Sequence, residues 1–197
     1  MFYLTEPSNQ TIAEFIESQK RAPFTYKGVG ATNGFRIPPG YTVDHNRVKL
    51  GRGVAIYRRA CQALREWKQF DLGWVTLVPA GVPLEVGVTV AVKARAFGTW
   101  SLSAAQVVYL INKDGPTRRF GFAYGTLPDH VESGEERFTI EHYSGDDSVW
   151  YDILAFSRPR HPLVRMSFPL ARMLQKRFAK ESLRRMIREC SESTQYS

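Results

Sequence analysis

The residues from Arg118 to Pro159 alternate between large apolar and polar or small side chains, which is the period of a β-strand. They form three such runs, joined by two polar turns. In the first run one face carries Phe120, Phe122 and Tyr124, whereas the other carries only glycine and alanine. A glycine and alanine face lets another element or a ligand approach the backbone closely. These runs predict three antiparallel strands, whose faces the rest of the chain has to cover.

Outside this stretch the sequence predicts an α+β fold with a long C-terminal helix. Apolar residues recur at intervals of three and four from Val54 to Gln69 and from Leu163 to Ile187, which indicates two amphipathic helices. Strands are expected at residues 41–50, 73–78, 88–97, 100–111, 119–126, 135–143 and 148–156. A curved antiparallel sheet of about six to seven strands must bury its concave face, and only the C-terminal helix is long enough to fill it.

The apolar positions of the predicted C-terminal helix fall into two rows. One row holds Leu163, Met166, Leu170, Met173, Leu174 and Phe178, and the nearly opposite row holds Ala179, Leu183, Met186 and Cys190. This pattern fits either a helix that breaks near Ala179 or a helix whose last turns pack on a second surface.

Positive charge is concentrated in the same segment. Between Arg160 and Glu189 there are nine lysines and arginines and two glutamates, which accounts for +7 of the net charge of +8. These cations either form the solvated face of a core helix or bind an anionic membrane surface or an acidic partner. A nucleic-acid partner has less support, because the chain carries no recognised DNA- or RNA-binding motif.

Residues 1–40 are expected to form an N-terminal arm that lies over the main domain. Thr11 and Glu14 have the spacing of a capping box, so a short helix is predicted from there to about Lys20. Several aromatic residues follow in a Gly- and Pro-rich stretch, which argues against a disordered tail. The predicted division is an arm at 1–40, a domain at 41–190 and a flexible tail at 191–197.

Several classes of protein are excluded by composition. The chain has no run of about eighteen apolar residues, and its first residues lack the basic and apolar regions of a signal peptide. Cys61 and Cys190 lie far apart and outside any metal-binding spacing, which indicates a reducing compartment rather than a disulfide framework. We therefore expect a cytoplasmic protein, with Cys61 as a small core residue.

Several stretches resemble a domain-of-unknown-function family found in bacteria and plants. They are VGAT at 29–32, PPGY at 38–41, VKLGRG at 48–53, FDLGWV at 70–75, FGFAYGTLP at 120–128, GEERF at 134–138 and VWYDILAFSRP at 149–159. The element order is also similar to that of the START-like helix-grip superfamily. That resemblance implies a sheet wrapped round the C-terminal helix and an apolar molecule such as a lipid held in the gap. Residues 1–40 have no counterpart in a minimal helix-grip domain, and one hypothesis is that they form a plug or lid over the cavity.

No catalytic motif is recognised, and the expected site is a binding site. If the aromatic face of the sheet looks inward, it supplies apolar contacts, and Glu136 or His142 orients a polar head group. If the glycine and alanine face looks inward instead, it seats the C-terminal helix. The residues expected to bind the ligand are Phe120, Phe122, Tyr124, Glu136, Phe138, His142, Trp150 and Phe156.

Other polar residues leave chemistry open as an alternative. The turn LPDHVESGEE offers carboxylates and the His130 imidazole to a hard metal ion, but a solvated acidic turn is commoner, and no metal site is expected. A buried Asp152 needs a cationic partner, which Arg137 or Arg158 can supply. The candidate acid–base groups are His130, Glu136, His142 and Asp152.

The sequence therefore predicts a protein that binds an apolar or amphipathic, lipid-like small molecule between the sheet and the C-terminal helix, without a cofactor. One alternative is a cyclase-, isomerase- or hydrolase-type enzyme that uses the same cavity. Another is an adaptor that binds an anionic membrane or nucleic acid through the basic helix. These hypotheses differ in whether a cavity exists between sheet and helix and in which side chains enter it.

Overall fold

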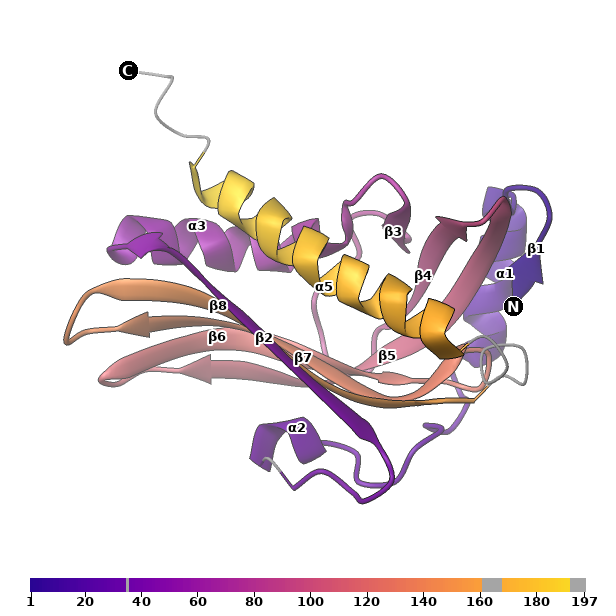
Figure 1. Cartoon of the computed structure of the whole chain (residues 1–197), viewed down its shortest axis with the longest axis horizontal. Helices are drawn as coiled ribbons and strands as arrows, with labels where there is room; N and C mark the ends of the chain where they lie inside the picture. The colour runs from indigo at the N-terminus through magenta and orange to yellow at the C-terminus, as the bar shows by residue number, and fades with distance from the viewer. Residues whose placement is uncertain (35, 161–167, 192–197) are drawn as a thin grey trace.

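The predicted strands are all present and lie in one antiparallel sheet. The computed structural model describes residues 1–34, 36–160 and 168–191. The strands are β1 (Phe2–Tyr3), β2 (Thr42–Arg52), β3 (Val75–Val78), β4 (Thr89–Ala96), β5 (Thr99–Lys113), β6 (Thr117–Thr126), β7 (Glu132–Tyr143) and β8 (Ser148–Pro159). Their order is β2-β8-β7-β6-β5-β4-β3, with β1 paired to β5 (Figure 1). Within the described residues the sheet thus has eight strands, because the short β1 joins the predicted set.

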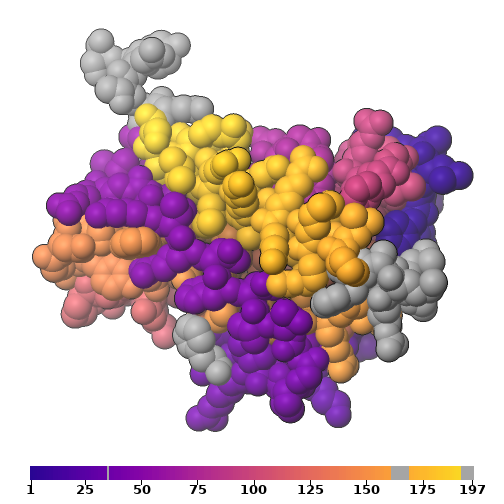
Figure 2. All heavy atoms as spheres, viewed as in Figure 1, coloured from indigo at the N-terminus to yellow at the C-terminus, as the bar shows by residue number. Residues whose placement is uncertain are grey.

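Helices cover both faces of this sheet. They are α1 (Asn9–Gln19), α2 (Ala31–Gly34), α3 (Val54–Arg65), the 3-10 turn η1 (Lys68–Phe70) and α5 (Phe168–Ser191). α3 and α5 lie on one face, and α2 lies on the other (Figure 1). The outer side of α5 is exposed at the surface beside β2 (Figure 2). This arrangement confirms the α+β helix-grip prediction. Among the described residues no helix combines the length and apolar character needed to cross a bilayer.

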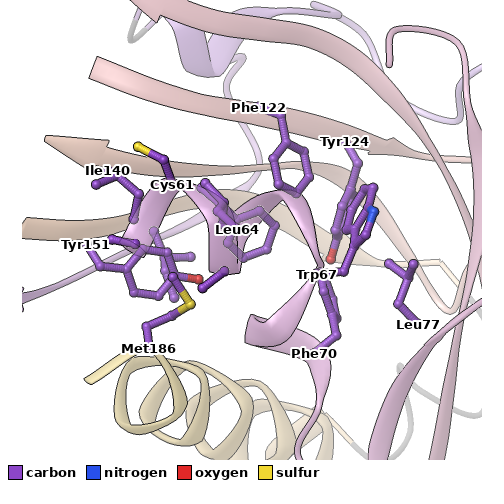
Figure 3. Packing of buried hydrophobic residues seen from close by; sticks show 14 of the residues in the cluster. Cys61, Leu64, Trp67, Phe70, Leu77, Phe122, Tyr124, Ile140, Tyr151 and Met186 are labelled. Atoms are coloured by element: carbon purple, nitrogen blue, oxygen red, sulfur yellow. The ribbon is translucent and has the colours of Figure 1, made fainter. Parts of the chain in front are cut away.

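The aromatic face of β6 looks toward α3 and α5. The Phe122 ring packs edge-on against Trp67, with ring centroids 4.7 Å apart, and Tyr124 lies 5.9 Å from Phe70. Figure 3 shows the β6 side chains directed at the residues of α3 and η1. The inward aromatic face is therefore the correct one of the two sequence alternatives, and this cluster is the main core.

The glycine and alanine face of β6 receives the N-terminal arm. A Cβ atom added at Gly125 would lie 2.2 Å from the Tyr26 hydroxyl oxygen, so only glycine leaves space for that ring. The alternative in which these small residues seat the C-terminal helix is wrong. The small residues instead allow residues far away in the sequence to pack on the outer face.

One buried carboxylate ties the arm to that outer face. Glu135, which is 2% exposed, accepts hydrogen bonds from the Tyr26 hydroxyl (2.7 Å), the Gly30 N–H (2.6 Å) and the Thr32 N–H (2.9 Å). The Thr32 hydroxyl donates a further hydrogen bond to Glu135. Because α2 lies on the face opposite α5, this part of the arm does not plug the space beside α5 (Figure 1).

α1 covers the same outer face at the other end of the sheet. Ile12, Phe15 and Ile16 of α1 pack with buried residues of β4 and β5, including Ala91 and Leu102. The helix begins earlier than the sequence suggests. Ser8 is its N-cap, and the Ser8 hydroxyl accepts a hydrogen bond from the Thr11 N–H at 3.1 Å. The predicted capping box at Thr11 and Glu14 is therefore wrong, although the helix itself is confirmed.

α5 is continuous through Ala179, so the break, one of the two sequence alternatives, is wrong. Its last turns bury Met186 and Cys190 against α3, and the Arg59 guanidinium donates a 2.7 Å hydrogen bond to the Cys190 carbonyl. The second surface expected for the apolar row from Ala179 to Cys190 is thus the region of α3. In the other row Met173 is half-exposed, and Leu163 and Met166 lie outside the described residues.

The helix predicted from Val54 to Gln69 ends earlier, at Arg65. Trp67 has a left-handed backbone conformation, with a φ of 58°, which interrupts the helix before the short turn η1. The turn directs Phe70 into the core, and the Trp67 indole N–H donates to the Val82 carbonyl at 3.0 Å. This interruption shapes one wall of the space under α5.

Candidate functional site

A cavity of about 1110 Å³ lies between the inner face of the sheet, η1 and α5. Its walls are mainly apolar, and its size slightly exceeds the roughly 300–1,000 Å³ of typical small-molecule sites. Apolar residues of the lining include Phe70, Trp74, Val92, Ala94, Ile153, Ala155, Leu174, Phe178 and Leu183. Because interiors of folded proteins are close-packed, a cavity of this size is a candidate ligand-binding site.

The cavity reaches the surface of the protein. Phe97, in the turn between β4 and β5, belongs to its lining and is 63% exposed. Val43 on β2 and Leu170 on α5 also line it, with 49% and 38% of their surfaces exposed. Phe2 is the member of the N-terminal arm that lines the cavity among the described residues. A ligand can therefore enter without unfolding of the sheet.

Glu136 and Tyr124 form a polar pair in the cavity wall. The two residues are opposite each other on β7 and β6, and the Tyr124 hydroxyl donates a 2.7 Å hydrogen bond to Glu136 Oε2. Burial raises the pKa of the Glu136 carboxyl to about 7, although the Tyr124 hydrogen bond opposes that shift. A carboxyl group with this pKa can exchange a proton near neutral pH, which suits both ligand binding and acid–base chemistry.

Glu132 is a second carboxyl group of the lining. It precedes Glu136 by four residues on β7, so the two side chains point to the same face. The Gln175 amide donates a hydrogen bond to Glu132 and another, of 3.1 Å, to the Ser157 hydroxyl. Burial raises the pKa of the Glu132 carboxyl to about 7, while the Arg172 charge lowers it.

Arg172 is already neutralised by another carboxylate. Its two terminal nitrogens donate to both carboxylate oxygens of Asp44 on β2, at 2.5 and 2.8 Å. This bidentate geometry is the strongest form of an arginine–carboxylate pair. Asp44 and Arg172 therefore close the edge between β2 and α5 beside the cavity.

His130 also belongs to the lining, and its imidazole is neutral. Its Nδ1 atom accepts a 3.0 Å hydrogen bond from the Glu132 N–H, which requires an unprotonated nitrogen. Burial lowers the His130 pKa to about 4. The acid–base candidates His130 and Glu136 are thus brought together at the cavity.

Three predicted ligand-binding aromatic residues face inward but do not reach the cavity. Phe122 and Phe138 are fully buried, with ring centroids 5.3 Å apart, and are not among its lining residues. Phe120 lies farther along β6 beneath the Arg65 guanidinium, which is 4.1 Å from its ring centroid. Of the three, Phe138 packs against Tyr124, with ring centroids 5.7 Å apart. The expectation that the three rings contact a ligand does not fit these positions.

The predicted inward orientation of Trp150 and Phe156 is wrong. Trp150 lies under the Arg47 guanidinium, 4.4 Å from its ring, and Phe156 packs edge-on against Tyr26 and Tyr41, with ring centroids 5.6 and 5.2 Å away. Phe156 does belong to the cavity lining. Alternation along β8 nevertheless directs its ring outward, because its inward-facing neighbours Ala155 and Ser157 also line the cavity.

His142, a predicted ligand-binding residue, lies away from the cavity, and so does Asp152, an alternative acid–base candidate whose preferred interpretation is a structural ion pair. His142 is buried on the inner face, where its Nε2 is 2.6 Å from Asp147 and its ring stacks on Tyr57. Asp152 lies on the outer face and accepts a 2.9 Å hydrogen bond from Arg137, which is one of its two predicted partners. His45 Nε2 lies 2.5 Å from the other oxygen of Asp152. Both residues therefore have structural partners and no contact with the cavity.

The acidic turn between β6 and β7 is divided between the two faces. Asp129 accepts a 2.8 Å hydrogen bond from Gln19 of α1. Glu132, Glu135 and Glu136 are all lining residues of the cavity, but the Glu135 carboxylate holds the arm on the outer face. In the part of the chain that the structure describes, no three His, Cys, Asp or Glu side chains gather closely enough to hold a metal ion.

Glu132, Ser157 and Gln175 are site residues that the sequence prediction missed. β7 begins at Glu132, three residues earlier than expected, so this glutamate was assigned to a turn. Alternation extended back from Glu136 through Gly134 would have placed Glu132 on the same face. Gln175 is not part of an apolar row of α5, so the sequence gives no signal for it. Its position at the cavity follows only from the way α5 packs on the sheet.

Residues 25–185 match the family model described as a domain of unknown function (DUF1990). The chain belongs to the DUF1990 family. Every lining residue of the cavity except Phe2 falls within the matched range, so the cavity is a feature of the DUF1990 domain of this protein.

Relatives of this DUF1990 protein occur in distant organisms. A UPF0548 protein of Deinococcus radiodurans is 37% identical over 95% of this chain and 98% of its own length. A UPF0548 protein of Dictyostelium discoideum is 35% identical over 95% of both chains. The UPF0548 protein At2g17695 of Arabidopsis thaliana is 34% identical over 78% of this chain and 76% of its own.

Solved structures share the fold of the DUF1990 chain at low sequence identity. TTHA0849 from Thermus thermophilus has a TM-score of 0.50 at 12% identity, covering 78% of this chain and 99% of that one. Human STARD10 has a TM-score of 0.49 at 12% identity, and the match covers 96% of this chain and 82% of the STARD10 chain. Similarity at this level concerns the fold alone.

Proposed function

We propose that this DUF1990 protein binds an apolar or amphipathic small molecule between its sheet and α5. The supporting observation is the cavity of about 1110 Å³ with mainly apolar walls and an opening at the surface. An apolar cavity of this size forfeits packing contacts while it is empty, so a ligand that fills it gains them.

The polar groups of the lining favour an amphipathic ligand over a purely apolar one. Leu174 and Phe178 of α5 offer apolar contacts, whereas Tyr124 and Glu136 offer hydrogen bonds from the sheet. An amphipathic molecule satisfies both kinds of wall, because its chain displaces water and its head group meets the polar pair.

Native mass spectrometry of protein purified gently from a cell extract tests this proposal. We expect a co-purifying small molecule on the wild-type chain and on Ala55→Phe, which changes an exposed position of α3. Ala171→Phe, which adds a ring at the cavity lining on α5, should lose it. If neither extract ligands nor added apolar probes bind the folded wild-type protein, the proposal is wrong.

A second candidate function, compatible with the first, is association with an anionic bilayer through α5. Its exposed side carries a row of cations at intervals of four, which we call the basic face: Lys176, Lys180, Arg184 and Arg188. Within the described residues none of the four forms an ion pair. Like charges at this spacing repel one another, and an anionic surface would remove that repulsion.

Vesicle sedimentation tests the second candidate. We expect binding to phosphatidylcholine vesicles that contain phosphatidylserine, little binding to pure phosphatidylcholine, and loss of binding at high salt. Lys176→Glu with Lys180→Glu should abolish binding, whereas Lys27→Glu with Lys113→Glu, at exposed positions outside α5, should preserve most of it. Binding that ignores lipid charge, or a preference for DNA over vesicles, would contradict this candidate.

A further inference from the structure

The polar wall of the cavity carries two carboxyl groups that form no ion pair within the described residues. Glu132 and Glu136 point into the cavity from one face of β7. The side-chain hydrogen bonds to the two carboxyl groups within the described residues come from neutral groups: the Tyr124 hydroxyl to Glu136, and the Gln175 amide and the Ser157 hydroxyl to Glu132. A buried carboxylate without a cation is unfavourable unless it takes up a proton or a positively charged ligand.

The nearby cations of the described residues either form an ion pair with another carboxylate or form no ion pair. Arg172 makes its bidentate pair with Asp44, on the side of β2. Lys176 and Lys180 belong to the lining but form no ion pair with a carboxylate in the described part of the chain. Both lysines lie at exposed positions of α5, and within the described residues the Glu136 carboxylate has no salt-bridge partner.

We infer that the cavity selects an amphipathic cation whose ammonium head group binds Glu136, with Glu132 as the second negative group and the apolar chain lying along α5. The inference rests on the proposed function and specifies the ligand class for the same cavity. An ammonium group donates up to three hydrogen bonds, which suits two carboxylates that form no ion pair in the part of the chain that the structure describes.

The geometry leaves Glu136 able to accept a second donor. Tyr124 occupies Oε2, and no hydrogen bond to Oε1 comes from the described residues. The Tyr124 hydroxyl thus holds the Glu136 carboxylate in place, and Oε1 of Glu136 can accept a hydrogen bond from the ammonium group of a ligand. Leu174, Phe178 and Val92 line the adjoining cavity and can contact an alkyl chain.

Binding of a cation must displace the proton that these carboxyl groups hold near neutral pH. Because burial raises both pKa values to about 7, an ammonium ligand binds more tightly at pH 8 than at pH 6. An alkylamine stays protonated over this range, as a lysine side chain does. The groups that face the two carboxyl groups are Tyr124 of β6, Tyr151 of β8, Asp44 of β2, His130, and Arg172 and Gln175 of α5.

Three probes with the same twelve-carbon chain separate head-group recognition from apolar binding. Binding of dodecylamine, dodecanol and dodecanoate is measured by calorimetric titration at pH 6 and pH 8, below the concentrations at which the probes aggregate. We expect dodecylamine to bind about tenfold or more tightly than dodecanol at pH 8, and dodecanoate to bind most weakly. Dodecylamine binding should weaken at pH 6 and release protons to the buffer.

The variant Glu136→Gln removes the charge but keeps an oxygen that can accept the Tyr124 hydrogen bond. It should lower dodecylamine affinity about tenfold and leave dodecanol affinity unchanged. Glu85→Gln, at an exposed position, is the matched control and should bind like wild type.

The outcomes distinguish this inference from the function on which it rests. Equal binding of all three probes, independent of pH, would overturn head-group selection and leave the proposed function intact. Dodecanol binding that is tighter at pH 6 than at pH 8 would also overturn head-group selection, because a protonated Glu136 would then recognise a neutral head group. Failure of every probe to bind folded protein would overturn both.

Discussion

Glu135 and Glu136 are adjacent on β7, yet their carboxylates face opposite sides of the sheet. Glu135 holds the N-terminal arm through four hydrogen bonds, whereas Glu136 lines the cavity and accepts one from Tyr124. Alternation along a strand thus places a structural and a candidate ligand-binding carboxylate next to each other. Substitutions at the two positions should therefore separate stability from binding.

Glu135→Gln should destabilise the protein by about 2–4 kcal/mol, because a buried amide cannot accept every hydrogen bond that the carboxylate accepts. The N-terminal arm loses its anchor, so hydrogen exchange of residues 25–34 should become faster than that of β7. Urea denaturation measures the loss of stability, and mass spectrometry locates the exchange. Glu136→Gln is the control at pH 5 and should stay within about 1 kcal/mol of wild type. Equal stability of both variants would show that Glu135 does not anchor the arm.

Gly125→Ala should destabilise the protein by about 1–3 kcal/mol through overpacking. The added Cβ would meet the Tyr26 hydroxyl oxygen at 2.2 Å and the Tyr26 ring carbons at 2.8 and 2.9 Å. In the Tyr26→Ala background the same substitution should become nearly neutral, which a double-mutant cycle detects. Gly145→Ala meets no heavy atom within 4 Å and serves as the control. Additive effects of the two substitutions would contradict this contact.

The strands and the aromatic core could be predicted because alternation and helical spacing depend only on local sequence. The face of each strand was harder to predict, as Trp150 and Phe156 show. On β8 both faces are largely apolar, since one is buried by α3 and α5 and the other by the arm. Alternation alone cannot choose between two buried faces. The register that pairs Trp150 with Glu141 decides it, and that register is a long-range property.

The polar part of the cavity lining was predicted where a polar residue interrupted an apolar face. Glu136 stands out beside Phe138 in sequence, and Tyr124 lies on the aromatic face of β6. Gln175 and Asp44 give no such signal, because their roles arise from the way α5 crosses the sheet. Helix crossing depends on tertiary packing, which no local pattern encodes.

The stability of the ligand-free protein should fall as pH rises from 5 to 8. The folded pKa of Glu136 is about 7 and its ordinary value is 4.5, so the protein binds an extra proton when it folds. This contribution is fully present below pH 4.5 and is lost as pH rises through 7. Relative to Glu136→Gln, wild type should lose about 2 kcal/mol between pH 5 and pH 8 in urea denaturation. A constant difference between the two proteins across this range would rule out the raised pKa.

Cys61 and Cys190 should report local opening between α3 and α5. Both thiols are buried, and burial raises each pKa to about 11, so neither should react with Ellman's reagent at pH 8 in the native protein. Arg59→Ala removes the hydrogen bond to the Cys190 carbonyl and should speed labelling of Cys190 about fivefold to tenfold.

The exposed neighbour of Arg59 on α3 provides the control for that experiment. Arg58→Ala removes a similar side chain and should leave the labelling rate unchanged. Mass spectrometry of the labelled protein identifies which thiol reacted. If Cys190 of the wild-type chain reacts within seconds, the end of α5 does not rest on α3, and the wall of the cavity is open. Slow labelling that Arg59→Ala accelerates would instead mean that this hydrogen bond holds α5 in place over the cavity.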